Sequence, residues 1–229
     1  MSIETRLLKL ISIVVAPTLI LTIVFIYFQQ SNAQVNEQVA TIENSYYEQY
    51  GLNSINSERQ NSIDKVMKII SRYNRKMDDS LAYAIANEIY LMSQKYPNLN
   101  VDFIAATITH ESAQTWSPTV TSKVGAMGLM QVMPATGAFL AVEEGIRWSS
   151  ATSILYDPIL NIRLGCRYLN ELVGLYEKDG GLAAYNGGPR RAEMWIAANR
   201  NNKILWKETR DYVPAVLKLY EQFRSEGAM

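Results

Sequence analysis

Residues 101–111 read VDFIAATITHE and predict a buried helix. Asn100 stands directly before them, and asparagine is one of the side chains that cap helix N-termini. Few polar residues interrupt the apolar ones that follow, so a helix here has little surface suited to water. We therefore expect this helix to begin at residue 101 and to form part of the core.

Glu111 ends this stretch, and its place on the helix is informative. Ile104, Ile108 and Glu111 stand at i, i+4 and i+7, so they share one face of the helix. A carboxyl group at the inner end of an apolar stripe loses hydration, and this loss raises its pKa. A general acid that works near neutral pH needs such a raised pKa. The alternative is a glutamate at a helix end that faces solvent or an arginine.

The segment that follows is rich in glycine and methionine. Residues 125–134 read GAMGLMQVMP. Glycine lets a ligand approach the backbone closely, and Gln131 carries both donors and acceptors for the hydroxyl or amide groups of a sugar. Taken alone, this segment is also compatible with a core loop.

Four short motifs, in this order, closely resemble those of the soluble lytic transglycosylase domain. They are Glu111-Ser112, GAMGLMQ at 125–131 with Met133-Pro134, AYNGGP at 184–189, and ETR at 208–210 with Tyr212-Val213. Any one of them is weak evidence, whereas the four together are specific. The resemblance implies a mainly helical, α+β lysozyme-like fold. It also implies cleavage of the β-1,4 bond between N-acetylmuramic acid and N-acetylglucosamine in the glycan strands of peptidoglycan.

The resemblance also implies roles for individual residues. Glu111 would be the catalytic acid and base. The substrate-binding residues would be Ser122 on the muramic-acid side, Gln131 and Met133 along the cleft, Tyr185 and Asn186 against the scissile bond, and Glu208 and Tyr212 in support of the site. The chain departs from the family's spacing at Gln114-Thr115, which lengthen the segment before Ser122.

The number of carboxylates bears on the mechanism. Ordinary glycosidases use two of them, but the motifs supply only Glu111. Asp102 lies about two and a half turns away on the same helix, and Glu143 and Glu144 fall in a segment without a motif. The family needs no second carboxylate, because the C6 hydroxyl of the substrate attacks C1 and leaves a 1,6-anhydro end. A muramidase of the same fold, in which water attacks, and a non-catalytic wall-binding scaffold subunit are the alternatives.

Other reactive or aromatic residues have simpler interpretations. His110 points about 100° away from Glu111 on a helix, so we expect a packed or partly exposed side chain. Cys166 is expected to be a small buried hydrophobe. Four tryptophans are expected in the core, with sugar stacking as the alternative: Trp116, Trp148, Trp195 and Trp206. The basic excess in residues 190–210 fits either steering of anionic stem peptides or a solvated rim. The sequence has no metal-ligand spacing and implies no cofactor.

Residues 10–28, LISIVVAPTLILTIVFIYF, carry no charge. As a helix they span about 28 Å at about 1.5 Å per residue, close to the hydrocarbon core of a bilayer. Arg6 and Lys9 precede them, and residues 29–58 contain acidic but no basic side chains. This pattern predicts a single-pass inner-membrane protein with a cytoplasmic N-terminus and a periplasmic catalytic domain. A cleaved signal peptide ending near Ser31-Asn32-Ala33 is the alternative.

Composition completes the predicted organisation. The chain has 229 residues, with 22 basic against 22 acidic side chains, which argues against a nucleic-acid binder. Most prolines and glycines lie after residue 96, so we expect an anchor at 1–29, a spacer and helical stalk at 30–77 and the catalytic domain at 78–229. Further segments are predicted as an amphipathic helix at 57–74, a helix capped by Asp79 or Ser80 that ends before Pro97, loops or a small hairpin at 113–135, and helices at 158–178 and 209–225.

Overall fold

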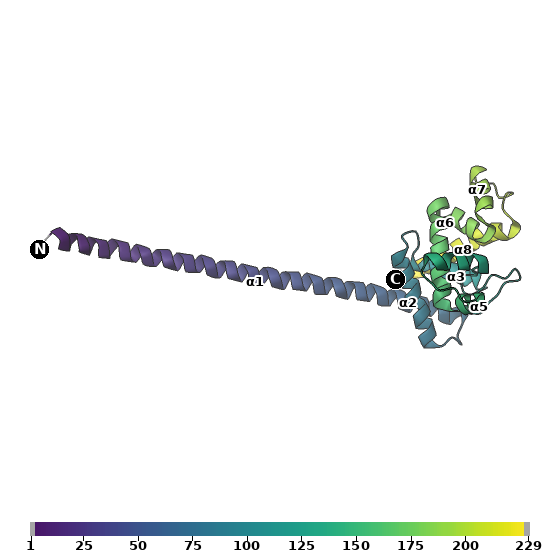
Figure 1. The fold of residues 1–229 in the computed structure, drawn as a ribbon, viewed down its shortest axis with the longest axis horizontal. Helices are drawn as coiled ribbons and strands as arrows, with labels where there is room; N and C mark the ends of the chain where they lie inside the picture. The colour runs from purple at the N-terminus through teal and green to yellow at the C-terminus, as the bar shows by residue number, and fades with distance from the viewer. Residues whose placement is uncertain (1–2, 227–229) are drawn as a thin grey trace. The chain divides into compact units, whose positions relative to one another are not determined.

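The computed structural model describes the backbone of residues 3–226 and the side chains of residues 22–226, except 43–44, 46–50 and 52–53. The chain divides into two compact units, Met1–Ser57 and Glu58–Met229. Helix α1 (Ile3–Tyr73) begins in the first unit and ends in the second (Figure 1).

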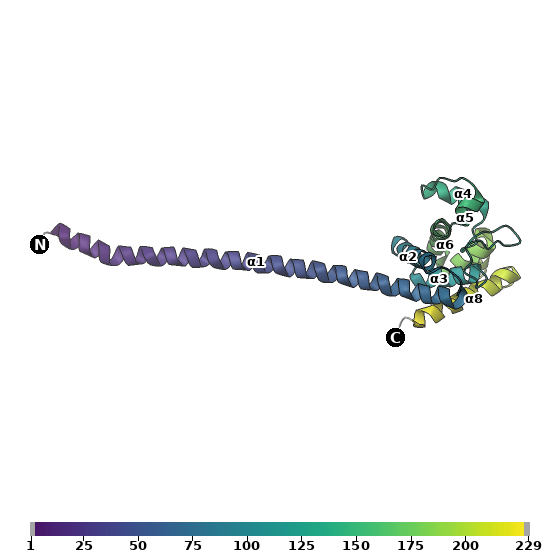
Figure 2. The same cartoon turned by 90° about the horizontal axis from the view of Figure 1, so that it is seen from below.

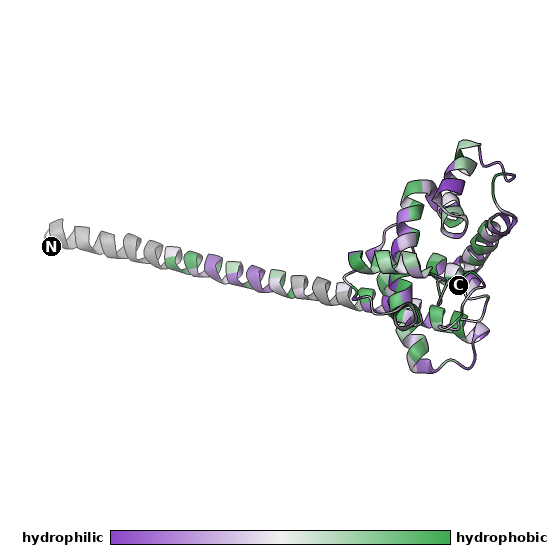
Figure 3. Ribbon diagram, turned by 45° about the vertical axis from the view of Figure 1, so that its right-hand side comes forward, coloured by the Kyte–Doolittle hydropathy of each residue, from purple (hydrophilic) through white to green (hydrophobic). Residues whose placement is uncertain are grey.

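The first unit is helical along its described length. Residues 30–56, which lie in the predicted spacer and helical stalk, belong to α1. This segment contains no proline, and Gly51 is its one glycine, so little in it opposes a helix. Residues 23–28 of the helix are all apolar or aromatic, whereas residues 29–42 are a mixture of hydrophilic and apolar residues (Figure 3). All residues from 22 to 42 are exposed.

No helix among the residues whose side chains are described is both long and apolar enough to cross a membrane. The span predicted at residues 10–28 falls mainly on residues 10–21, which lie outside that set. The span therefore stays a prediction.

The second unit begins at Glu58, so it contains the end of the predicted stalk as well as residues 78–229. The reason is the apolar face at the end of α1, where Ile63, Val66 and Ile70 are buried in the same core as α2 and α3. The basic side chains of this segment lie on its outer faces. Two of them form ion pairs, Lys65 with Asp102 at 2.6 Å and Arg72 with Glu226 at 3.0 Å.

Seven further helices complete the second unit: α2 (Asp79–Lys95), α3 (Val101–Glu111), α4 (Pro134–Glu143), α5 (Ala151–Leu155), α6 (Pro158–Gly187), α7 (Pro189–Ala197) and α8 (Lys207–Glu226). Helix α6 runs through the middle and packs against α2, α4, α5, α7 and α8 (Figures 1 and 2). Helix α3 packs against α2 and α8. The unit is therefore mainly helical, and α6 connects most of its parts.

The predicted helix at 101–111 is confirmed, with the predicted cap. Asn100 Oδ1 accepts a hydrogen bond of 2.9 Å from the backbone N–H of Phe103, and Phe103, Ile104 and Ile108 are fully buried. The start of α2 differs from the prediction, because Asp78 rather than Asp79 or Ser80 is the N-cap and accepts from the N–H groups of Ser80 and Leu81.

The other predicted helices are present with different bounds. Helix α6 extends well beyond residue 178, but Glu177 interrupts it with φ 65° and ψ −177°, so Lys178–Gly187 forms a second segment after a kink. Helices α4, α5 and α7 were not predicted. Extended structure within residues 3–226 is limited to isolated antiparallel bridges that join Met127 to Thr121 and to Val132, as expected for a small hairpin at 113–135.

Candidate active site

One cavity of about 820 Å³ brings together the residues that the sequence motifs single out. Its walls come from the end of α3, the loop of residues 120–133, the end of α6 and the first turns of α8. All eight predicted site residues line it: Glu111, Ser122, Gln131, Met133, Tyr185, Asn186, Glu208 and Tyr212. Segments about one hundred residues apart in the sequence thus meet around one cleft.

Glu111 is the last residue of α3 and is partly exposed to the cleft. The hydroxyl of Tyr212 donates a hydrogen bond of 2.6 Å to its Oε1. Within the described part of the chain, Oε2 has no hydrogen-bond partner. One oxygen is therefore fixed by the protein, while the other is available to a substrate.

The surroundings of Glu111 raise the pKa of its carboxyl group to about 7. Burial is the largest cause, the hydrogen bond from Tyr212 opposes it, and the negative charge of Glu208 adds to it. A group with this pKa is present in both protonation states near neutral pH, so it can serve as acid and as base. The pKa shift predicted from the helix face is confirmed.

Two tyrosines, the buried Tyr212 and the partly buried Tyr185, line the cavity beside this carboxylate. Tyr185 donates a hydrogen bond of 2.7 Å to the backbone oxygen of Met130, and Tyr212 donates to Glu111. Burial and the charge of Glu111 raise the pKa of both phenols well above the usual value. Both hydroxyls therefore stay protonated and act as donors.

Asn161, fully buried on α6, holds the glycine-rich loop in place. Its Nδ2 donates to the backbone oxygens of Met127 and Leu155, at 2.9 and 3.0 Å, and its Oδ1 accepts from the N–H of Met130 at 2.8 Å. Gly128 allows this close approach, because a Cβ on it would lie 2.2 Å from the Leu155 oxygen. No motif or spacing in the sequence indicates this role for Asn161.

Gln131 adopts a left-handed backbone conformation with φ 48°. Its Nε2 donates to the backbone oxygens of Val120 and Gly128, at 3.2 and 2.8 Å. The amide nitrogen thus stabilises the loop, and the amide oxygen is the group left to accept from a ligand. The sequence predicts that Gln131 offers both donors and acceptors to a sugar. In the structure its Nε2 already donates two hydrogen bonds, so the amide oxygen is the group that can accept one from a sugar.

Ser122, from the same loop, closes a turn. Its N–H donates to the oxygen of Ala126 at 2.9 Å, and its Oγ accepts from the N–H of Ala126 at 3.0 Å. The hydroxyl proton is still available to a ligand. Met133, which precedes α4, is 43% exposed and adds an apolar surface.

Several cleft residues were not predicted. His110 is partly exposed, and its ring packs edge-to-face on that of Tyr212, with centroids 4.8 Å apart; burial lowers its pKa, which favours the neutral imidazole. Lys123 and Asp211 also line the cavity. They adjoin Ser122 and Tyr212 in the sequence, and this adjacency is the signal that could have found them.

The three carboxylates that the sequence offers as possible partners of Glu111, namely Asp102, Glu143 and Glu144, lie outside the cleft and are ion-paired. Asp102 pairs with Lys65. Glu143 and Glu144 both pair with Arg167, at 2.8 and 3.3 Å. The acidic side chains that share the cleft with Glu111 are therefore Glu208 and Asp211. In the described part of the chain, no three or more histidine, cysteine, aspartate or glutamate side chains are arranged so that they could hold a metal ion.

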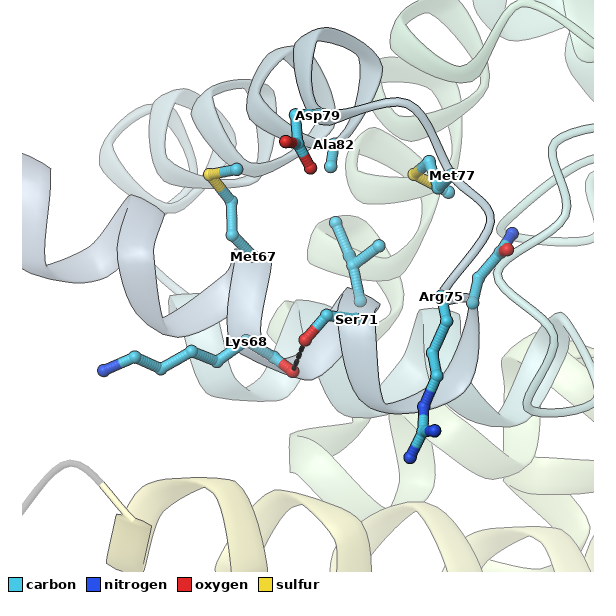
Figure 4. A pocket seen from close by; sticks show the side chains of 9 residues that line it. Met67, Lys68, Ser71, Arg75, Met77, Asp79 and Ala82 are labelled. Carbon is cyan, nitrogen blue, oxygen red and sulfur yellow. Dashed lines mark hydrogen bonds between the residues drawn. The ribbon is translucent and has the colours of Figure 1, made fainter.

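A second cavity, of about 270 Å³, lies where the end of α1 meets the start of α2. Met67 and Met77 flank it, and Ser71 within it donates to the backbone oxygen of Lys68 (Figure 4). It contains none of the predicted site residues. The larger cavity is therefore the candidate active site.

The predicted burial of Cys166 and of the tryptophans is confirmed for some of these residues and is wrong for Trp206. Cys166, Trp116 and Trp195 are buried, as predicted. The predicted core position of Trp206 is wrong, because this residue directly precedes α8 and is 59% exposed. Part of the basic excess at 190–210 is neutralised, since Arg200 pairs with Glu177 and Asp179 and Lys207 pairs with Asp211.

Comparisons of sequence agree with this geometry. Residues 88–206 match the transglycosylase SLT domain family. The soluble lytic murein transglycosylase of Escherichia coli (strain K12) is 33% identical over 157 residues, which cover 63% of this chain and 23% of that protein. The transglycosylase of Enterobacteria phage PRD1 is 37% identical over 105 residues, covering 45% of this chain and 35% of that protein. The chain therefore spans only a minor part of the length of these relatives.

Solved structures are similar to this chain as well. An inactive mutant of the lytic transglycosylase Slt from Pseudomonas aeruginosa superposes with a TM-score of 0.53 at 28% identity, covering 60% of this chain and 23% of that one. The 70-kDa soluble lytic transglycosylase of Escherichia coli gives a TM-score of 0.53 at 29% identity, covering 63% and 26%. The mainly helical fold is thus that of a lytic transglycosylase.

Proposed function

Because the chain belongs to the transglycosylase SLT domain family, we propose that it is a peptidoglycan lytic transglycosylase. It cleaves the β-1,4 bond between N-acetylmuramic acid and N-acetylglucosamine and leaves a 1,6-anhydro-muramoyl end. The observation that carries this proposal is Glu111 in the cleft, with a pKa of about 7 and a hydrogen bond from Tyr212.

Glu111 acts twice in the proposed reaction. Protonated Glu111 first gives its proton to the glycosidic oxygen, and the bond from that oxygen to C1 breaks. The resulting carboxylate then takes the proton of the substrate's C6 hydroxyl, whose oxygen forms the new bond to C1. Glu111 ends the cycle protonated. The reaction therefore consumes no water and needs no second carboxylate. Tyr212 supports the carboxylate stage, because a hydrogen bond to the charged form stabilises it.

A muramidase is the second candidate function, because the cleft contains further carboxylates. Glu208 and Asp211 lie in the same cavity as Glu111, and a second carboxylate is what a hydrolytic glycosidase needs to direct water or stabilise the intermediate. The two reactions differ in their products, since a hydrolytic product gains one water and an anhydro product does not.

Release of soluble fragments from purified peptidoglycan tests the enzymatic assignment. We expect the full chain to release them and the Glu111→Gln variant to release none above background. Glu143→Gln is the matched control, because Glu143 is ion-paired with Arg167 outside the cleft, and it should retain activity. Release by Glu111→Gln at the wild-type rate would contradict the assignment. Absence of release by the wild type would favour the scaffold alternative.

We also propose that the N-terminal part of α1 anchors the protein in the inner membrane, with the catalytic unit in the periplasm. Residues 23–28 support this proposal, since each of their side chains is at least 56% exposed although all are apolar or aromatic. A helix that is hydrophobic all round needs an apolar environment. Carbonate extraction of membranes with N-terminal sequencing tests it: an intact N-terminus in the membrane pellet is expected. A soluble protein that begins at Gln34 would contradict the anchor.

A further inference from the structure

Trp206 is unusual among the tryptophans of this chain because it faces solvent. Its side chain is 59% exposed, whereas Trp116 is fully buried and Trp195 is 6% exposed. Tryptophan is a highly buried residue type on average. A single exposed apolar residue is common on protein surfaces, so the inference depends on how this indole is held and where it lies.

Arg191 holds the indole in position. Its guanidinium carbon lies 3.7 Å from the centroid of the Trp206 ring, a stacked cation–π arrangement. Its Nη1 also donates a hydrogen bond of 2.7 Å to the backbone oxygen of Ile204, which ties the arginine to the segment before α8. Because Arg191 covers one face of the indole, the exposed area belongs to the opposite face and the edges.

The position of Trp206 relative to the cleft is set by the chain itself. Glu208, two residues further on, lines the cavity that contains Glu111. Two residues span at most about 7 Å of chain. The backbone of Trp206 is therefore next to the wall of the cleft, within reach of a sugar that continues a strand bound there.

Resting on the function proposed above, we infer that Trp206, held by Arg191, forms an additional sugar-binding subsite that lengthens the glycan cleft. A pyranose ring has an apolar face of C–H groups, and the open face of a fixed indole is flat, apolar and electron-rich. Arg191 orders the indole before binding, so little side-chain entropy is lost when the sugar stacks on it. The ligand is a glycan strand long enough to extend past Glu208.

The dependence of affinity on glycan length tests this inference. The Glu111→Gln variant of the full chain is titrated with muropeptide-derived glycan oligomers of increasing length, so that no cleavage occurs. In this background, affinity should rise with length until the additional subsite is filled. Trp206→Ala should abolish the last increment, about two- to tenfold in Kd, and leave the affinity for the shortest oligomer unchanged. Arg191→Ala should lose part of it.

Three further readouts make the result decisive. Trp206→Phe should keep part of the increment, because phenylalanine retains an aromatic face. Leu175→Ala is the control for loss of an exposed apolar side chain on α6 and should bind every oligomer like its parent. Tryptophan emission should change when long oligomers bind the parent, and this change should be absent in Trp206→Phe.

Equal affinity of Trp206→Ala and its parent for all oligomers would overturn the subsite, as would an equal loss at every length or a parent that binds no oligomer. These outcomes are separate from failure of the proposed function. Binding is measured without catalysis, so a wild-type enzyme that releases hydrolytic products would contradict the transglycosylase assignment and leave the subsite intact.

Discussion

The hydroxyl of Tyr212 donates a hydrogen bond of 2.6 Å to Oε1 of Glu111 and so joins α8 to the end of α3. This bond stabilises the ionised carboxylate and works against burial, which stabilises the protonated form. The pKa of about 7 is the result of this opposition. We therefore expect the pH dependence of the reaction to shift when a substitution removes either the hydrogen bond that lowers this pKa or a group that raises it.

Removing the hydroxyl should raise the pKa of Glu111. In Tyr212→Phe, burial is no longer opposed, so the fraction of protonated Glu111 at neutral pH increases while the carboxylate needed as base becomes scarcer. The limb of the rate profile that reports Glu111 should move to higher pH, and kcat should fall. Rates of glycan release between pH 5 and 9 measure this shift. An unchanged profile would show that the hydrogen bond does not control the carboxylate.

Removing the charge of Glu208 should have the opposite effect. Its negative charge helps raise the pKa of Glu111, so Glu208→Gln should move the same limb to lower pH. Asp211→Asn is the matched control, because Asp211 lies in the same cleft but is paired with Lys207 at 2.6 Å. The control should leave the limb in place. Equal shifts in both variants would contradict the specific role of Glu208.

Asn161 should be essential for stability, because its side chain makes three buried hydrogen bonds to backbone groups. Asn161→Ala leaves those groups without partners, and each buried unsatisfied group costs about 1–3 kcal/mol. We expect the free energy of unfolding to fall by about 3 kcal/mol or more, measured by urea titration. Asn170→Ala, whose side chain accepts one long bond near the surface, should cost less than about 1 kcal/mol.

Two glycines with similar backbone angles should respond differently to alanine. Gly128 has φ 79° and Gly125 has φ 89°, so both substitutions carry the cost of a left-handed residue, about 1–2 kcal/mol. A Cβ at Gly128 would also lie 2.2 Å from the Leu155 oxygen, whereas a Cβ at Gly125 meets nothing within 4 Å. Gly128→Ala should therefore destabilise the protein much more in urea titrations. Similar losses in the two variants would contradict the packing described here.

The local features of the site could be predicted from sequence. Asn100 has the chemistry of a helix cap, and the i, i+4, i+7 spacing of Ile104, Ile108 and Glu111 places the carboxyl group at the end of an apolar stripe. The resemblance to the family then named seven more residues, and the structure brings all of them into one cleft. Their individual roles stay predictions.

Features that depend on tertiary contacts could not be predicted. Asn161 has the sequence context of an ordinary helix residue, and its role exists only because the loop at Gly128 packs against α6. Trp206 was expected in the core, since composition does not show that Arg191 covers one face and leaves the other open. The apolar face at the end of α1 was visible, but its partner was not, and the compact unit that contains this face begins at Glu58.

The origin of the oxygen at C1 in the product distinguishes attack by the C6 hydroxyl from attack by water. Peptidoglycan is digested in water labelled with oxygen-18, and the fragments are examined by mass spectrometry. We expect unlabelled 1,6-anhydro-muramoyl ends from the wild type and none from Glu111→Gln. Labelled reducing ends from the wild type, or anhydro ends released by Glu111→Gln at the wild-type rate, would contradict this expectation.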